Sequence, residues 1–289
     1  MLTLLYTTFG GKMERHREIE KSIIKKYRKE IWSKFIKAIK EYELIEENDK
    51  IAVCISGGKD SMLLAKCFQE LKRHGQMQFE LEFIVMDPGY NEENITMINK
   101  NAKILNIPIK IFNTDIFNVV SLHGMNEPCY LCARMRRGHL YSIAEGLGCN
   151  KIALGHHYDD VIETILLNIF YNGSHQTMMP KLVSKNFKGI ELIRPLYLVR
   201  EKNIINWVKS NELSFMRCGC MVTIAGNATK RNEIKQLINE LEKTNPNIVK
   251  NIFSSSSNIN LDSLLGYKKN GTKISFLDNY SSPQKNNML

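Results

Sequence analysis

One short run of small and polar residues, Ser56-Gly57-Gly58-Lys59-Asp60-Ser61, limits what this chain can fold into more than any other feature of its sequence. It directly follows the apolar stretch 51–55, so a strand ends in Ser-Gly-Gly and a helix begins near Ser61. The flexible glycines leave backbone N–H groups at the start of that helix, where an anion binds favourably. The spacing fits neither G-x-x-x-x-G-K-S/T nor the three spaced glycines of a dinucleotide fingerprint. The run predicts a phosphate-binding loop of another kind, with a ligand-free turn as the alternative.

Apolar runs alternate with helical periods from Lys50 onward. We expect strands at 51–55, 79–86, 109–112 and 151–154, each followed by a helix. This β-α alternation predicts an α/β fold with a doubly wound, Rossmann-like parallel sheet, whose ligands bind at the carboxyl ends of the strands. The loop at 56–61 and a second polar block at 155–160 both fall at that edge.

Before this region lies a basic stretch, and formal net charge is +10, with Lys and Arg dense between Arg15 and Lys40. Its apolar residues recur every four positions and predict one amphipathic N-terminal helix. Its basic outer face could lie along a nucleic-acid backbone or simply face water. The apolar residues of this helix are Ile23, Tyr27, Ile31, Phe35 and Ile39.

We divide the chain into an N-terminal basic helix (1–46), a nucleotide-binding domain (47–215) and a C-terminal segment (216–289) with cysteines, a helical extension and a flexible tail. Within the last part, the stretch 260–267 has enough apolar character to dock on the core. No run of about twenty apolar residues suits a membrane span, and the opening residues 1–5 are too short for a signal peptide. We therefore expect a cytoplasmic protein.

The second polar block, Gly155-His156-His157-Tyr158-Asp159-Asp160, leads into a predicted helix. Asp160 and Glu163 are three apart and share a face near the helix start. They could bind a hard cation, or serve as ordinary capping and dipole partners. Beside a phosphate loop we expect Mg²⁺, with Asp160 first among Asp60, Asp159 and Asp160 as ligands. The opposite face is expected to be buried through Ile162, Ile165, Leu166, Ile169 and Phe170.

Seven cysteines, an odd number, do not read as a disulfide framework in a chain of 289 residues. Cys129 and Cys132 form a C-x-x-C pair, and Cys218 and Cys220 follow far downstream. Such thiolates suit zinc or an iron–sulfur cluster, while a redox dithiol and buried thiols are the alternatives. The remaining cysteines lie in apolar segments and are expected to be small buried hydrophobes, namely Cys54, Cys67 and Cys149.

These blocks together resemble the TtcA family of tRNA 2-thiocytidine synthetases, which are PP-loop ATP pyrophosphatases. The resemblance covers roughly 35–241 and implies an adenine nucleotide alpha hydrolase-like fold. One departure is that Cys218-x-Cys220 stands where the family has a second C-x-x-C. The resemblance is carried by Ala38–Tyr42, Ile45, Asn48, Asp49, Ser56–Ser61, Met86–Tyr90, Cys129-x-x-Cys132, Gly155–Thr164, Met179–Leu182, Arg194–Leu196 and Arg200-Glu201-Lys202.

The resemblance implies a tRNA-cytidine 2-sulfurtransferase that converts ATP to AMP and pyrophosphate. ATP would adenylate the C2 oxygen of an anticodon-loop cytidine, position 32, and sulfur carried on a [4Fe-4S] cluster would replace it to give 2-thiocytidine. The implied cofactors are ATP, Mg²⁺ and the cluster. The implied partners are tRNA and a cysteine desulfurase or other sulfur donor, and a homodimer stays open.

The resemblance and the placement of residues at the strand ends together give the expected site residues. Asp87, at the end of the second strand, is expected either to contact the adenosine or to help position the loop. Lys59, Asp60 and Asp160 are expected to be catalytic, with Asp160 also holding Mg²⁺. Cys129, Cys132 and Cys220 are expected to ligate the cluster, with Cys218 as the alternative third ligand. ATP is expected to bind Ser56, Gly57, Gly58, Lys59, Asp60, Ser61, Asp87, Gly155, His156 and Asp160.

Several related activities stay open at this point. A lysidine synthetase shares the loop but needs no paired cysteines, and the tRNA 2-thiouridine enzymes usually add zinc-finger cysteine pairs at both ends. A thiouridylase with a catalytic disulfide would need only two cysteines. A non-catalytic nucleotide-binding module with structural zinc would bind ATP without releasing pyrophosphate.

Overall fold

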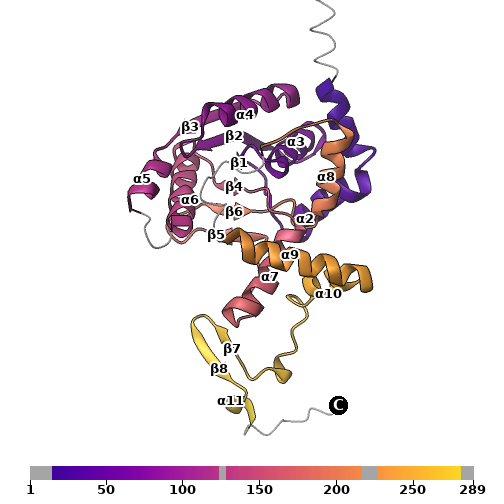
Figure 1. The fold of residues 1–289 in the computed structure, drawn as a ribbon, viewed down its shortest axis with the longest axis vertical. Coiled ribbons are helices and arrows are strands. Elements are labelled where there is room, and N and C mark those ends of the chain that lie inside the picture. Colours follow the sequence, from indigo (N-terminus) through magenta and orange to yellow (C-terminus); the bar gives the residue numbers. More distant parts are fainter. Residues whose placement is uncertain (1–14, 124–127, 217–226, 281–289) are drawn as a thin grey trace, which may run out of the picture.

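A computed structural model describes residues 15–123, 128–216 and 227–280. Its centre is a six-stranded sheet of order β3-β2-β1-β4-β6-β5, parallel except for the edge strand β5 (Figure 1). The four predicted strands are confirmed as β1 (Asp49–Cys54), β2 (Phe79–Asp87), β3 (Ile109–Asn113) and β4 (Lys151–Ala153). The sequence pattern did not predict β5 (Lys181–Val183) and β6 (Glu191–Ile193), because three residues are too few to show a period.

Helices cover both faces of this sheet, which confirms the doubly wound fold. On β1, Ile51 and Val53 face one hydrophobic cluster, and Ala52 and Cys54 face another, because successive side chains alternate. The first cluster includes α2 (Ser33–Glu41), α3 (Lys59–His74), α4 (Glu92–Leu105) and α8 (Glu201–Ser210). The second includes α6 (Pro128–Gly146), and the remaining helices of this region are α5 (Ile116–His123) and α7 (Tyr158–Asn172).

The prediction of one continuous N-terminal helix is wrong. Residues 15–24 form an α-helix, a turn follows, and a π-helical turn, η1 (Arg28–Trp32), leads into α2. The apolar residues recur every four positions, whereas an α-helix has 3.6 residues per turn. In a regular α-helix these residues would therefore rotate gradually away from the core. The wider π turn, with Trp32 N–H donating to Tyr27 O at 3.3 Å, keeps Ile31 and Phe35 buried.

A buried charge cluster fixes the helix at 15–24 to α3. The ammonium of Lys66, which is fully buried, donates to Glu20 and to Leu105 O at 2.8 Å. Burial raises the pKa of Glu20, but hydrogen bonds from Arg73 and Lys66 outweigh it and hold this pKa at about 2. On the other side, Trp207 Nε1 donates to Ser22 Oγ at 3.1 Å, so the same helix also packs on α8.

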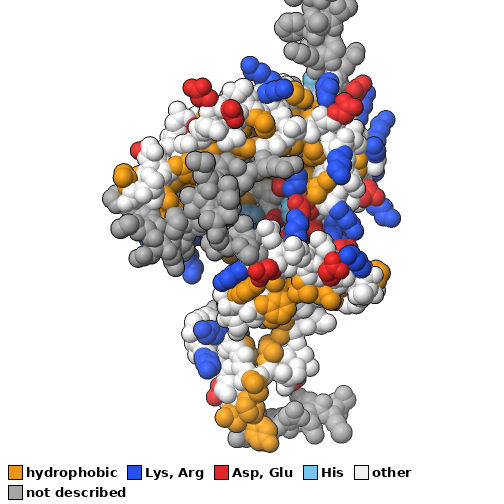
Figure 2. All heavy atoms as spheres, in the orientation of Figure 1, with side chains coloured by type: hydrophobic (Ala, Val, Ile, Leu, Met, Phe, Trp, Pro, Cys, Tyr) orange, Lys and Arg blue, Asp and Glu red, His pale blue; other side chains and the backbone are white. Residues whose placement is uncertain are grey.

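The C-terminal part is helical at first, with α9 (Asn227–Thr244) and α10 (Ile248–Ser254). The expectation that 260–267 docks on the core is wrong. It forms η3 (Leu261–Ser263) and the start of a hairpin of β7 (Gly266–Lys269) and β8 (Thr272–Ser275), followed by α11 (Leu277–Tyr280). Leu265 is 85% exposed, and the hairpin stands away from the sheet with hydrophobic side chains on its surface (Figures 1 and 2).

The burial expected for α7 holds only in its first half. Ile162 and Ile165 are fully buried, whereas Ile169 and Phe170 are exposed because the helix runs out beyond the sheet. None of the helices in the described ranges has the length and apolar character needed to cross a bilayer.

Candidate active site

The loop between β1 and α3 has the geometry of an anion cradle. Gly57 adopts φ +82°, and a Cβ there would lie 2.7 Å from Ile98 Cγ1, so only glycine fits. Gly58 is the extended N-cap of α3 and, within the described ranges, no side chain caps this helix. The first N–H groups of α3 therefore stay available to an anion, as the sequence predicts.

The two serines of the loop hold its shape. Ser61 Oγ accepts a hydrogen bond from Ser56 N–H at 3.2 Å and donates to Gly58 O at 3.0 Å. The two hydroxyl oxygens are also 3.2 Å apart. Ser61 is thus a brace across the loop as well as a predicted phosphate contact.

Lys59 and Asp60 begin α3 at the mouth of the loop. The Lys59 ammonium lies 3.1 Å from Asp60 Oδ2 and 3.0 Å from Glu201 Oε1. Burial lowers the Lys59 pKa, but these two carboxylates outweigh it and raise the pKa above its ordinary value. Burial raises the pKa of Asp60, although His157 and Lys59 oppose it. Asp60 Oδ1 is buried and accepts no hydrogen bond from any described residue, so this oxygen suits an incoming cation or donor.

The second polar block packs directly on the first. A Cβ on Gly155 would lie 3.0 Å from the carbonyl carbon of Asp60 and the nitrogen of Ser61, so the two backbones are in contact. His157 then caps α7. Its Nδ1 accepts from Asp160 N–H at 3.4 Å, and Asp160 Oδ2 accepts from His157 N–H at 2.9 Å. The predicted meeting of both blocks at one sheet edge is confirmed.

Asp160 and Glu163 meet a cation that the sequence pattern did not reveal. Arg231 of α9 donates to Glu163 Oε2 at 2.7 Å and to Asp160 Oδ1 at 3.4 Å. Glu163 is buried, and burial raises its pKa against the opposing effect of Arg231. The partners are 68 and 71 positions apart, so no local spacing could have identified Arg231. Figure 2 shows acidic, basic and histidine side chains gathered on this part of the surface.

Asp159 holds the start of α8. Its two oxygens accept from Arg200 Nε at 3.0 Å and from Glu201 N–H at 2.6 Å. Glu201 then contacts Lys59 and, through its other oxygen, Lys235 of α9. The motif Arg200-Glu201-Lys202 therefore links three helices around the loop, a role that the sequence resemblance did not assign. Among the described residues, no three carboxylate, histidine or cysteine side chains are grouped as ligands of one metal ion.

His156 lies against the end of β6. Burial lowers its pKa to about 4, so the ring is neutral at pH 7. Arg194 Nε approaches its Nδ1 at 3.4 Å, and burial also lowers the pKa of Arg194, to about 10. A neutral imidazole beside a guanidinium can position a nucleotide by hydrogen bonding without adding positive charge.

The loop after β2 contributes from the neighbouring strand. Asp87 Oδ1 accepts from Gly89 N–H at 2.9 Å and from Tyr90 N–H at 2.6 Å, which fixes the turn after the strand. Tyr90 is also bonded through its hydroxyl to Arg136 Nη2 of α6 at 2.8 Å. Asp87 therefore positions this loop, and its expected contact with ATP stays a prediction.

Comparisons with known proteins identify the family and the domain. The PP-loop domain model ATP_bind_3 matches residues 27–241. The tRNA-cytidine(32) 2-sulfurtransferase of Citrifermentans bemidjiense is 38% identical over 233 residues, covering 79% of this chain and 90% of that protein. The tRNA-cytidine(32) 2-sulfurtransferase 1 of Francisella tularensis subsp. novicida is 37% identical over 251 residues, covering 85% and 92%.

This chain belongs to the tRNA-cytidine(32) 2-sulfurtransferase family of PP-loop proteins. Among solved structures, the U34-tRNA thiolase NcsA from Methanococcus maripaludis with its [4Fe-4S] cluster has a similar fold, with a TM-score of 0.63 and 23% sequence identity. The similarity covers 78% of this chain and 76% of NcsA.

In this member of the 2-sulfurtransferase family, α6 carries the C-x-x-C pair beside the end of β2. Cys132 is buried against Met86, Ile116 and Val120. The side chain of Cys129, and Cys218 and Cys220 entirely, lie outside the described residues. The predicted burial of Cys54, Cys67 and Cys149 is confirmed. Burial raises the pKa of each of these thiols, and that of Cys149 rises to about 11.

Proposed function

We propose that this chain is an ATP-dependent tRNA sulfurtransferase that converts the cytidine at position 32 of the anticodon loop to 2-thiocytidine. The observation that carries this proposal is the uncapped N-terminus of α3, with Lys59 and Asp60 at its mouth, in a chain 38% identical to a tRNA-cytidine(32) 2-sulfurtransferase. A tRNA substrate supports a cytoplasmic location.

The loop would bind the phosphates of ATP. N–H groups at the start of α3 and the Lys59 ammonium would stabilise the negative charge that develops on pyrophosphate as the cytidine C2 oxygen attacks the α-phosphate. Binding would draw Lys59 away from Glu201, which keeps Lys235 as a partner. His156 and Asp87 lie at the neighbouring strand ends and are our candidates for adenosine contacts.

Mg²⁺ fits the carboxylates at the loop. Asp60 has a buried oxygen that accepts no hydrogen bond from a described residue, and Asp160 lies on the other side of His157, so one or two protein oxygens and the ATP phosphates would suffice as ligands. Bound there, Mg²⁺ would offset the charge of the leaving pyrophosphate.

The cysteines would hold the sulfur-carrying group. Cys132 lies near the start of α6 at the carboxyl edge of the sheet, on the same side as the phosphate loop. With Cys129 and Cys220, or Cys218, it would provide three thiolates for a [4Fe-4S] cluster, and a cluster held there would supply the sulfur that replaces the activated C2 oxygen, which leaves as AMP. The sulfide would come from a cysteine desulfurase or another donor.

The decisive experiment is mass spectrometry of nucleosides in tRNA from a host that lacks cytidine thiolation, with and without this gene. We expect 2-thiocytidine only when the gene is present, and iron and sulfide in the anaerobically purified protein. Appearance of lysidine or 2-thiouridine instead would show that the enzyme modifies a different base or position. If the protein binds ATP but releases no pyrophosphate and forms no new nucleoside, the proposed enzymatic role is contradicted.

A further inference from the structure

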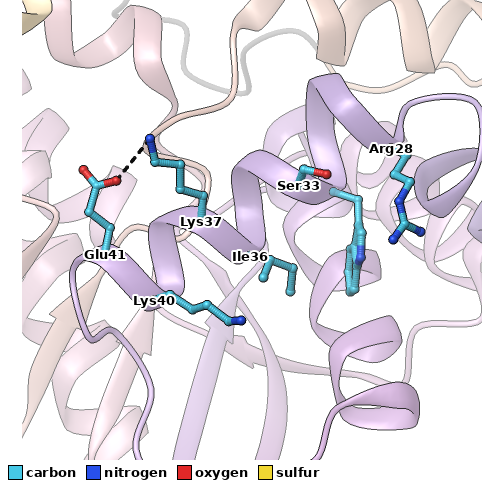
Figure 3. Close-up of a pocket in the computed structure, with 7 residues that line it drawn as sticks. Arg28, Ser33, Ile36, Lys37, Lys40 and Glu41 are labelled. Atoms are coloured by element: carbon cyan, nitrogen blue, oxygen red, sulfur yellow. Dashed lines mark ion pairs between the residues drawn. The ribbon is translucent and has the colours of Figure 1, made fainter.

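A hollow of about 530 Å³ lies along η1 and α2 of the N-terminal segment (Figure 3). We call it the Trp32 groove. Figure 3 shows Arg28 at one end and Lys40 at the other, with Ile36 between them. The groove is lined by Arg28, Trp32, Ser33, Ile36, Lys37, Lys40 and Glu41.

The groove contains an aromatic ring that the fold does not fully bury. Its neighbours Ile31 and Phe35 are fully buried, whereas Trp32 is only half-buried. One side of the indole stacks on Phe35, with ring centroids 5.7 Å apart and planes at 27°. The π turn η1 ends at Trp32, and such turns frequently lie at functional sites. A half-exposed, rigidly supported indole is a stacking surface for another flat group.

The charges around this ring are unbalanced. Lys37 and Glu41 neutralise each other at 3.4 Å. Arg28 and Lys40 are exposed and form no ion pair with any residue in the described ranges. The flanking sequence adds further exposed cations without acidic partners in the same ranges, namely Lys25, Lys26, Lys29 and Lys34. The groove therefore favours an anion at each end of its aromatic surface.

We propose that the Trp32 groove binds an unpaired nucleotide of the tRNA substrate, a step that rests on the proposed function. The base stacks on the half-exposed indole, and the two flanking phosphates contact Arg28 and Lys40. Aromatic stacking combined with cations along a groove is the usual way in which proteins bind single-stranded RNA without reading its sequence. A second copy of this chain is a poorer occupant, because a net charge of +10 repels its own kind.

The first test measures the affinity of an unmodified tRNA transcript at several salt concentrations, without ATP. Arg28→Gln with Lys40→Gln should weaken binding about tenfold and reduce the slope of log K against log salt by about 1.4, since each lost phosphate contact is worth about 0.7 for a single strand. The control is Lys100→Gln with Lys103→Gln, two exposed lysines of α4 that form no ion pair with a described residue. An equal loss in the control would overturn the proposal in favour of general charge attraction.

The second test separates stacking from charge. Trp32→Leu should weaken binding about 5- to 160-fold at unchanged salt slope, and Trp32→Phe should restore most of it, because a stacked base contributes about 1–3 kcal/mol. Thermal unfolding identifies variants that fail to fold. Wild-type affinity in folded Trp32→Leu, or a dimer in the wild type that the variant abolishes, would overturn the proposal.

Failure of this inference is distinguishable from failure of the proposed function. If the wild type produces 2-thiocytidine while the groove variants bind tRNA normally, only the groove assignment is wrong. If the wild type neither binds tRNA nor thiolates it, the proposed function fails first and the groove assignment fails with it.

Discussion

Gly57 shows how one residue can set the phosphate loop. Its φ is +82°, and a Cβ at this position would approach Ile98 Cγ1 to 2.7 Å, which leaves no room for another side chain. We expect Gly57→Ala to distort the loop at a cost of about 1–2 kcal/mol and to raise the KM for ATP in a pyrophosphate-release assay. Gly138→Ala is the matched control, because nothing lies within 4 Å of a Cβ there. An unchanged KM in Gly57→Ala would contradict the role of this loop.

Cys132 separates sulfur transfer from ATP chemistry. Its thiol lies in the apolar cluster behind β2, so Cys132→Ala should retain the fold. We expect loss of 2-thiocytidine and of bound iron, with ATP binding kept. Cys149 is a buried thiol in the cluster around α6, and Cys149→Ala should keep both thiolation and ATP binding. Thiolation by Cys132→Ala would remove this residue from the proposed ligand set.

His156 makes stability depend on pH. Its pKa in the folded protein, about 4, lies below the ordinary value of 6.5. Between pH 4 and pH 6.5, His156 is therefore protonated in the unfolded chain but neutral in the folded protein. The stability contributed by neutral His156 is complete above pH 6.5 and is lost as the pH falls towards 4. We expect urea denaturation to show a smaller difference between pH 7.5 and pH 5 in His156→Gln than in the wild type. Equal differences would show that His156 does not titrate in this way.

At the scale of single residues, the sequence predicts the loop glycines, the strand-end carboxylates and the inert cysteines, because each depends on neighbours in the chain. It does not predict that Arg231 neutralises Glu163 or that Asp159 caps α8, because both depend on residues brought together by folding. Two carboxylates three positions apart give the same sequence pattern whether they bind a metal ion or pair with an arginine.

Among the elements, α9 is held over the site by charge. Without Arg231, Glu163 would be buried without its hydrogen-bonded cation, so Arg231→Gln should destabilise the protein by about 1–3 kcal/mol. Chemical denaturation measures this loss. Lys243→Gln on the same helix is the control, because its pair with Glu240 is largely exposed and worth little. Equal stabilities for both variants would mean that the Arg231 pair is not a structural anchor.

The long, strongly periodic elements are predicted from sequence, and the short or irregular ones are not. Buried strands such as β1 and β2 stand out because unbroken apolar runs follow turn residues. The strands β5 and β6 depend on pairing with each other and with β4. The π turn in the N-terminal segment is also invisible to a periodicity search that assumes regular helices.

For the whole molecule, the C-terminal hairpin is a separate piece. None of its residues belongs to a described hydrophobic cluster, and Leu265 and Tyr280 are largely exposed. We expect a chain ending after Ser257 to keep the wild-type Tm and pyrophosphate release. A clear fall in Tm would show that the hairpin supports the core. The sequence could not predict this, because the apolar residues at 260–267 give the same pattern whether they pack on the core or stay exposed.

The packing of residues 15–24 against α8 also affects the order in which the chain can fold during synthesis. Of the described elements this helix leaves the ribosome first, yet Trp207, its hydrogen-bonded neighbour, emerges 185 positions after Ser22. Its contact with α3 can form early, but its packing on α8 must wait until α8 has also been synthesised. The helix itself carries only three cations, but exposed lysines follow it at 25, 26 and 29, so this basic stretch would help to keep the nascent chain soluble before it can meet any RNA.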